Sequence, residues 1–278
     1  MQTRAISSPV RGPEAAGGIR ASVFASLSIL VLVEPLIATA AERPDLFRRG
    51  SELTGDIWPV YNTHGEVLSV YWGRLAEEFA EFQFVVYDGE TEEILAQGHS
   101  IPCAWDGTLE GLPVGIDEVV ERGFQPDAPG RRGTLSGLAV EVPRRNQGRG
   151  LSRHVIGGMR SVAARHGMGA IIVPLRPLLK ERYPLVPIER YVEWTRPDGS
   201  PFDPWIRVHT GLGAAVLKPA PRSLKIVGRV EEWEAWTQMD FPESGDYVIP
   251  QGLALLSVDR VAGIGTYFEP NIWIRHRV

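Results

Sequence analysis

The chain has 278 residues and a mass of 30.7 kDa, which suits one large domain or one domain with an elaborate extension. Hydrophobic residues make up 44% and charged residues 23%, so the composition excludes disordered, collagen-like and multi-span membrane proteins. The net charge of 29 − 34 = −5 lacks the basic field that supports non-specific nucleic-acid binding, and we expect no nucleic-acid partner.

Cysteine and histidine usage gives no sign of a disulfide or a metal site. Cys103 is the lone cysteine, and its apolar surroundings predict a buried structural thiol rather than a nucleophile. The six histidines form no HExxH pattern and no Cys/His cluster. We therefore expect no metal.

The amino-terminal region combines features of a secretion signal with features of a folded segment. Three arginines precede an apolar run at residues 23–33, and Ala38-Thr39-Ala40 resembles a signal-peptidase site. The run is too short to span a bilayer, and residues 29–33 also suit a buried strand that leads into a Pro-started helix over 36–50. We expect a disordered tail at 1–22, a cytoplasmic protein and no membrane partner, with a secreted hydrolase as an alternative.

Hydrophobic periodicity predicts alternating helices and strands along the rest of the chain. Helical spacing extends over residues 66–79, 115–123 and 230–237. Residues 82–105, with a turn signal at 88–90, predict an antiparallel hairpin. Further strand-like runs lie at 247–249, 253–258 and 266–274.

Residues 135–174 predict a strand, a glycine-containing turn, a helix and a second strand. The turn, at 143–150 (PRRNQGRG), opens a helix over 151–168. Such a turn is an anion site, because its backbone can be approached closely, several amides are unpaired, and the helix dipole adds roughly half a positive charge. The turn lacks the Lys of a P-loop and the third Gly of a dinucleotide fingerprint, so we expect another pyrophosphate-bearing ligand.

Residues 138–168 resemble motif A of the GNAT superfamily of acyl-CoA-dependent N-acyltransferases. In that family a strand is followed by [QR]-x-x-G-x-[GA] and a helix, and residues 147–152 (QGRGLS) fill this pattern except that Ser152 ends it. The resemblance implies that the amides of Gly148 to Ser152 hold the pyrophosphate of coenzyme A and that the exposed edge of strand 138–142 pairs with pantetheine. The implied cofactor-binding residues are Leu138, Val140, Val142, Gln147, Gly148, Arg149, Gly150, Leu151 and Ser152.

A weaker resemblance to motif B of the same family implies catalytic candidates. The pair Leu212-Gly213 places His209 where the family often has a Tyr that protonates the leaving thiolate, and an imidazole can do the same. Acylation of an amine also needs a base, for which Glu141 is the leading candidate. Alternatively, His209 is a hydrogen-bonded residue of a helix face and Glu141 faces solvent.

The insertion at residues 175–204 is longer than a minimal core needs. Its aromatic and charged side chains, Arg176 and Tyr183 among them, are candidates to bind a carboxylate-bearing or phosphate-bearing acceptor. They are equally compatible with a helix that has a solvated basic face.

Together these features predict an α/β fold with a GNAT-like mixed, largely antiparallel central sheet, helices on both faces and a C-terminal extension. We expect an acyltransferase core at 23–222 and an extension at 223–278 on the same domain. The predicted function is direct transfer of an acyl group, most simply acetyl, from acetyl-CoA or another acyl-CoA to a small-molecule amine, with a homodimer as one possible assembly. The alternatives are a carrier-protein donor, a decarboxylating thioester enzyme, and a non-catalytic acyl-CoA-binding module.

Overall fold

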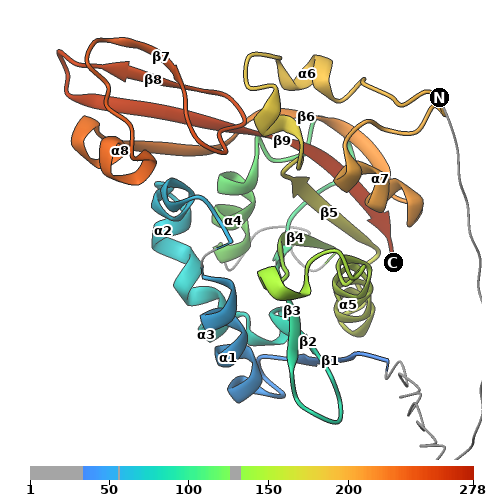
Figure 1. Ribbon diagram of the computed structural model, residues 1–278. Helices are drawn as coiled ribbons and strands as arrows, with labels where there is room; N and C mark the ends of the chain where they lie inside the picture. Colours follow the sequence, from blue (N-terminus) through green and yellow to red (C-terminus); the bar gives the residue numbers. More distant parts are fainter. Residues whose placement is uncertain (1–33, 56, 126–132) are drawn as a thin grey trace, which may run out of the picture. The chain divides into compact units, whose positions relative to one another are not determined.

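The computed structural model describes residues 34–55, 57–125 and 133–278 (Figure 1). These described residues form one compact unit. Within the described residues, nine strands form one sheet in the order β1-β2-β3-β4-β5-β9-β8-β7, with β6 paired to β9. All neighbours are antiparallel except β4 and β5, so the predicted mixed, largely antiparallel sheet is confirmed.

The first half of the sheet follows the predicted order of elements. Its strands are β1 (Leu36–Thr39), β2 (Phe84–Tyr87), β3 (Ile94–Cys103), β4 (Thr134–Glu141) and β5 (Ala170–Leu175). The predicted hairpin is formed by β2 and β3, and the predicted unit around the glycine-containing turn is formed by β4, α5 (Ser152–Arg165) and β5.

The helix predicted over residues 36–50 is wrong in its first part. Residues 36–39 form β1, which pairs with β2 from Leu36↔Tyr87 to Thr39↔Phe84, and α1 (Pro44–Thr54) starts at Pro44 instead of Pro35. Pairing with a neighbouring strand outweighs the local helical pattern here. The strand predicted at 29–33 and the tail predicted at 1–22 lie outside the described residues.

The helical segment predicted at residues 66–79 is divided into short pieces. These are α2 (Leu68–Tyr71), the 3₁₀ turn η2 (Trp72–Arg74) and α3 (Leu75–Glu78), with η1 (Val60–His64) before them and η3 (Ala80–Phe82) after them. The other helical segments are α4 (Ile116–Phe124), η4 (Arg144–Asn146), η5 (Lys180–Arg182), α6 (Ile188–Tyr191), α7 (Pro204–Gly211) and α8 (Val230–Thr237).

Helices cover both faces of the sheet, as predicted. Successive residues of β5 show the two faces: Ile171 packs in an apolar cluster with α5, whereas Ile172 belongs to the cluster that contains α4. Figure 1 shows α5 on one side of β2 to β5 and α1 to α3 on the other.

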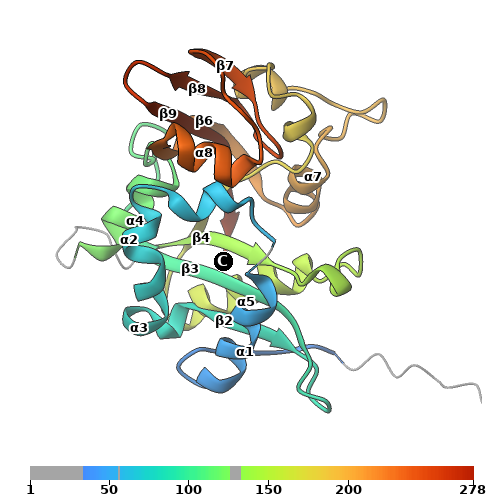
Figure 2. The same ribbon diagram turned by 60° about the vertical axis from the view of Figure 1, so that its left-hand side comes forward.

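The C-terminal part supplies the strand that completes the sheet. Strand β9 (Ile264–Arg277) pairs with β5 and with β8 (Leu255–Asp259) along one edge, and with β6 (Ala215–Arg229) along the other. Strand β7 (Gly245–Val248) pairs with β8 and extends the sheet beyond it. Helix α8 covers β6 and β9, and the Trp233 indole of α8 donates to the Gly265 carbonyl at 2.9 Å (Figure 2). The boundary predicted between 222 and 223 falls inside β6, so the residues after it belong to the core sheet.

Candidate active site

The two parallel strands of the sheet separate after a short paired stretch. Pairing of β4 with β5 ends at Ser136↔Ile172. Beyond this point β5 stays paired to β9 as far as Leu175↔Ile272, and β4 stays paired to β3 as far as Glu141↔Gln97. The edge of β4 that faces β5 is therefore open from Gly137 to Glu141, where the sequence predicted an edge for pantetheine.

The turn after β4 exposes a series of backbone amides. Gly148 and Gly150 have φ values of +77° and +74°, and a Cβ at either position would meet no atom within 4 Å. Within the described part of the chain, the N–H groups of residues 148–152 donate to no protein acceptor, and α5 begins at Ser152. Unpaired amides at a helix N-terminus bind anions.

Two side chains of this turn brace the loop. Gln147 Nε2 donates to the Val142 carbonyl at 3.2 Å, and Arg149 Nη1 donates to Asn146 Oδ1 at 2.9 Å. Buried Asn146 in turn donates to the Ile94 carbonyl at 3.2 Å. These hydrogen bonds anchor the loop to the sheet and leave its backbone amides unpaired. We call residues 147–152 the anion cradle. The cradle fits the pyrophosphate of a coenzyme A donor.

Glu141, at the end of β4, is buried at 6% exposure and does not face solvent. Its Oε1 accepts from the Trp58 indole at 2.7 Å, and its Oε2 accepts from the Thr54 hydroxyl at 2.7 Å. His99 Nε2 lies 3.4 Å from Oε2. Burial alone would raise the pKa of this carboxyl, but His99 and the two hydrogen bonds outweigh burial, and the net pKa is lowered.

A second buried carboxylate, Glu269 of β9, lies next to Arg176. Arg176 Nε donates to Glu269 Oε1 at 3.0 Å, and Arg176 Nη2 donates to the Gln251 carbonyl at 2.7 Å. Asn62 Nδ2 also donates to Glu269, at 3.3 Å. Arg176, which the sequence suggested as an acceptor-binding residue, thus has two of its donors engaged inside the protein while its side chain stays 17% exposed.

One short segment connects these two carboxylates. Trp58 contacts Glu141 at the end of β4, and Asn62 of η1, four positions later, contacts Glu269 of β9. Because β5 lies between β4 and β9 in the sheet, residues 58–62 extend over the part of the sheet where β4 and β5 separate.

His209 of α7 is held by a chain of polar contacts. Arg160 Nη2 lies 3.1 Å from His276 Nδ1, and His276 Nε2 lies 2.8 Å from His209 Nδ1. Since an arginine only donates, both Nδ1 atoms accept, and the remaining proton of His209 is on Nε2. That N–H is buried without a partner among the described residues. Burial, followed by His276 and Arg160, lowers the pKa of His209 to about 3, so the ring is neutral near pH 7.

Among the residues that the structure describes, Glu141 and His209 share no hydrogen-bond partner, so the two catalytic candidates have separate surroundings. The other candidate of the insertion, Tyr183, lies in an aromatic cluster with Tyr191, Trp194 and Phe202. Cys103 is fully buried, and burial raises the pKa of its thiol to about 12, in agreement with a structural role.

Sequence reasoning missed Trp58, Thr54 and His99, which surround Glu141. They lie 83, 87 and 42 positions before it, so no local spacing connects them to it. A histidine inside a predicted buried strand was the available signal, because a buried polar side chain needs a partner.

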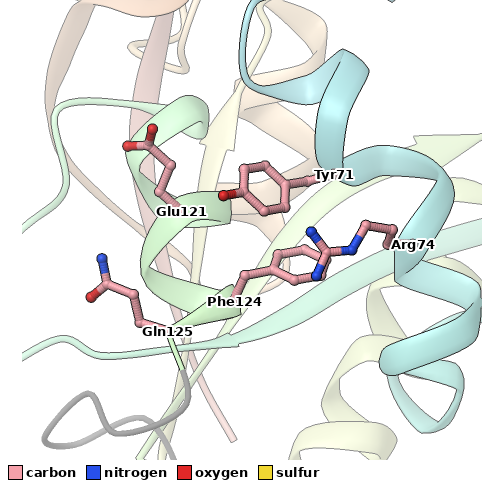
Figure 3. A pocket seen from close by; sticks show the side chains of 5 residues that line it. All are labelled: Tyr71, Arg74, Glu121, Phe124 and Gln125. Atoms are coloured by element: carbon pink, nitrogen blue, oxygen red, sulfur yellow. The ribbon is translucent and has the colours of Figure 1, made fainter.

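Figure 3 shows a surface pocket of about 390 Å³ whose lining includes none of these residues; it is lined by Tyr71, Arg74, Glu121, Phe124 and Gln125. The Arg74 guanidinium lies 4.6 Å from the Phe124 ring centroid and already pairs with Glu78. Elsewhere in the described residues, no three His, Cys, Asp or Glu side chains are grouped as metal ligands. No helix among them is long and apolar enough to cross a membrane.

Comparisons with known proteins agree with this geometry. No protein-family model matches the chain. Over 274 residues it is 30% identical to the arginine N-acetyltransferase avaD of Aspergillus versicolor, covering 87% of this chain and 93% of the relative.

Solved structures give the same fold. The loading GNATL domain of CurA from Lyngbya majuscula aligns with a TM-score of 0.55 at 16% identity, over 87% of this chain and 97% of that one. The GphF GNAT-like decarboxylase in complex with isobutyryl-CoA aligns with a TM-score of 0.53 at 15% identity, over 87% and 98%.

The open edge of β4, the anion cradle and the strand order define an acyltransferase fold. The chain belongs to the GNAT superfamily of acyl-CoA-dependent N-acyltransferases, as its sequence motif predicted.

Proposed function

We propose that this enzyme transfers an acetyl group from acetyl-CoA to an amino group of arginine or a closely related cationic amino acid. The observation that carries the donor half is the row of unpaired amides at residues 148–152, next to the open edge of β4. The acceptor half is supported by the similarity to an arginine N-acetyltransferase and by an ionised carboxylate beside that edge.

The donor is held by the backbone in this proposal. The amides of residues 148–152 and the dipole of α5 bind the pyrophosphate, and the edge at Leu138, Val140 and Val142 pairs with the pantetheine amides. Bound acyl-CoA supplies the acyl thioester. Backbone amides of the cradle orient the donor in this proposal, because the side chains of Gln147 and Arg149 are engaged in hydrogen bonds within the loop.

The acceptor binds near Glu141 in this proposal. An ionised carboxylate close to an indole attracts a cationic group, because the charge attraction is strengthened where water is partly excluded. Trp58 is half-buried and borders the surface, and it donates to the buried Glu141 carboxylate at 2.7 Å. Arg176 and Tyr183 remain candidates for the carboxylate end of the acceptor.

His209 is proposed to assist the leaving thiolate. Its Nε2–H is a donor held in one tautomer by His276 and Arg160, and a hydrogen bond to a developing thiolate lowers the energy of the transition state. Because the ring is 1% exposed, it acts only on a group that enters the interior beside α7.

The proposal is tested by incubating the purified protein with acetyl-CoA and each of the common amino acids, and by detecting N-acetyl products by mass spectrometry. We expect acetylarginine as the main product and a strong reduction in the Ser152→Asp variant, whose added negative charge repels the pyrophosphate. The matched control is Ser161→Asp, which places the same charge on the exposed part of α5. No acetylated product with any amine contradicts the proposal.

A further inference from the structure

Regular pairing from Gln97↔Glu141 to His99↔Ala139 places the side chains of His99 and Glu141 on one face of the sheet, two positions apart, and a β-bulge follows directly. His99 pairs with Ala139, but the next residue, Ser100, pairs with Gly137, so Leu138 is an extra residue on β4. Bulges of this kind bend a strand and redirect side chains, and they are frequent next to active sites. The bulge lies on the same open stretch of β4 that faces β5.

The surroundings of the His99 ring fix its orientation. Phe47 of α1 contacts the ring edge-on at 5.6 Å between centroids, and Trp72 of η2 lies at 5.1 Å. Glu141 of β4 faces Nε2 and, of these three neighbours, it alone carries a charge. The other ring nitrogen, Nδ1, has no hydrogen bond to any described residue, so the ring has one nitrogen toward the carboxylate and one available.

Glu141 is itself held firmly. Both of its oxygens accept hydrogen bonds at 2.7 Å, from Trp58 and Thr54, and these stabilise the ionised form. A carboxylate stabilised in this way is a weak base. An imidazole with an available ring nitrogen is better suited to remove a proton from an ammonium group, because its lone pair is not engaged by two hydrogen bonds.

We infer that His99 is the base that deprotonates the acceptor amine and that Glu141 is its positioning residue, a step that rests on the proposed acetyl transfer. Glu141 fixes Nε2–H toward itself, which leaves the Nδ1 lone pair to accept the proton. The acceptor ammonium gives one proton to Nδ1, and its nitrogen lone pair forms the N–C bond to the acyl carbon while the C–S bond breaks. The nitrogen then loses its second proton and the thiolate takes up one, so one proton is released to solvent overall.

The pH dependence of kcat/KM distinguishes the two roles. We expect wild-type kcat/KM to fall on the acid side as an imidazole becomes protonated. The His99→Gln variant is expected to lose about 100-fold or more in kcat/KM and to lose this acid limb. The Glu141→Gln variant is expected to keep the limb but move it to lower pH, because the imidazolium loses its partner charge.

Two controls keep this test separate from the proposed function. His166→Gln changes an exposed histidine at the end of α5 and is expected to match the wild type. Acetyl-CoA affinity, measured by calorimetry, is expected to be unchanged in His99→Gln, which also shows that the variant is folded. Wild-type protein that acetylates no amine defeats the proposed function itself, whereas active wild type with an equally active His99→Gln variant overturns only the inference.

A variant-independent measurement covers the case in which His99→Gln does not fold. Long-range ¹H–¹⁵N spectra of the full-length protein, assigned through ring contacts with Phe47 and Trp72, report the tautomer. We expect the Nε2–H form of His99 above neutral pH. An Nδ1–H form, or an acid limb that is retained in His99→Gln and lost in Glu141→Gln, would make Glu141 the base and overturn the inference.

Discussion

The indole N–H of Trp58 donates to the carboxylate of Glu141 at 2.7 Å and joins residues 83 positions apart in the chain. This bond connects the segment before η1 to the end of β4, just before the anion cradle. It places an aromatic ring and an ionised carboxylate at the same edge of the open stretch of β4.

Trp58→Phe removes this bond while retaining an aromatic ring. We expect a higher KM for the amine with an unchanged affinity for acetyl-CoA, because the variant disturbs Glu141, near which the amine is proposed to bind, and leaves the cradle unchanged. The free energy of unfolding is expected to fall by about 1.5 to 3 kcal/mol, the range for a hydrogen bond to a charged group. Steady-state kinetics and urea unfolding measure both effects.

The matched control for that variant is Trp105→Phe. It removes an indole hydrogen bond that stays within the loop after β3, from the Trp105 indole to the Thr108 carbonyl at 2.7 Å. A KM for the amine that rises equally in both variants would contradict a specific role of Trp58.

His209→Phe tests the proposed donor to the leaving thiolate. We expect a lower kcat with little change in acetyl-CoA affinity, because the N–H is needed mainly as charge develops on sulfur. Removal of one such donor costs about 100-fold or more in kcat. His64→Phe, at a ring stacked on Trp236, is the control, and an unchanged kcat in His209→Phe would exclude the role.

The same histidines predict how stability depends on pH. Burial lowers the pKa of His209 to about 3 and that of His276 to about 4, whereas an unfolded histidine has a pKa of about 6.5. Between these values the unfolded chain binds more protons, so the free energy of unfolding decreases as the pH falls from about 6.5 to about 4. Urea unfolding across this range should show a smaller slope in His209→Phe than in the wild type; equal slopes would refute the assignment.

Asp117 makes the free energy of unfolding depend on pH with the opposite sign. Burial raises its pKa to about 6, and its Oδ2 accepts from the Lys225 backbone N–H at 2.8 Å. The folded state therefore binds the extra proton, and the stability contributed by the protonated form is lost as the pH rises through about 6. Asp117→Asn is expected to match the wild type near pH 4 and to exceed its stability near pH 8, as measured by urea unfolding.

The sequence predicted the turn that we propose as the donor site, because that turn is local. The residues from Gln147 to Ser152 form one turn and one helix start, so their spacing is visible in the chain and the structure places their amides as expected. The periodicity of α4, α5 and α8 was also sufficient to place these helices.

The surroundings of Glu141 were not predictable in the same way, because they are assembled from distant segments. Glu141 obtains its partners from α1, from the segment before η1 and from β3, and only the pairing of β3 with β4 brings His99 to it. Strand β1 was missed for a related reason, since its four residues are defined by pairing with β2 and not by a local pattern.

Calorimetric titration of acetyl-CoA into the wild type, Ser152→Asp and Ser161→Asp tests the central claim most directly. The helix dipole stabilises an aspartate in the first turn of a helix, so Ser152→Asp should stay folded while its charge repels the pyrophosphate. The account predicts saturable binding to the wild type and to Ser161→Asp, with an affinity at least about tenfold lower in Ser152→Asp, or about 1.4 kcal/mol. Equal binding by all three proteins, or no binding by the wild type, would contradict the assignment of residues 147–152 as the donor cradle.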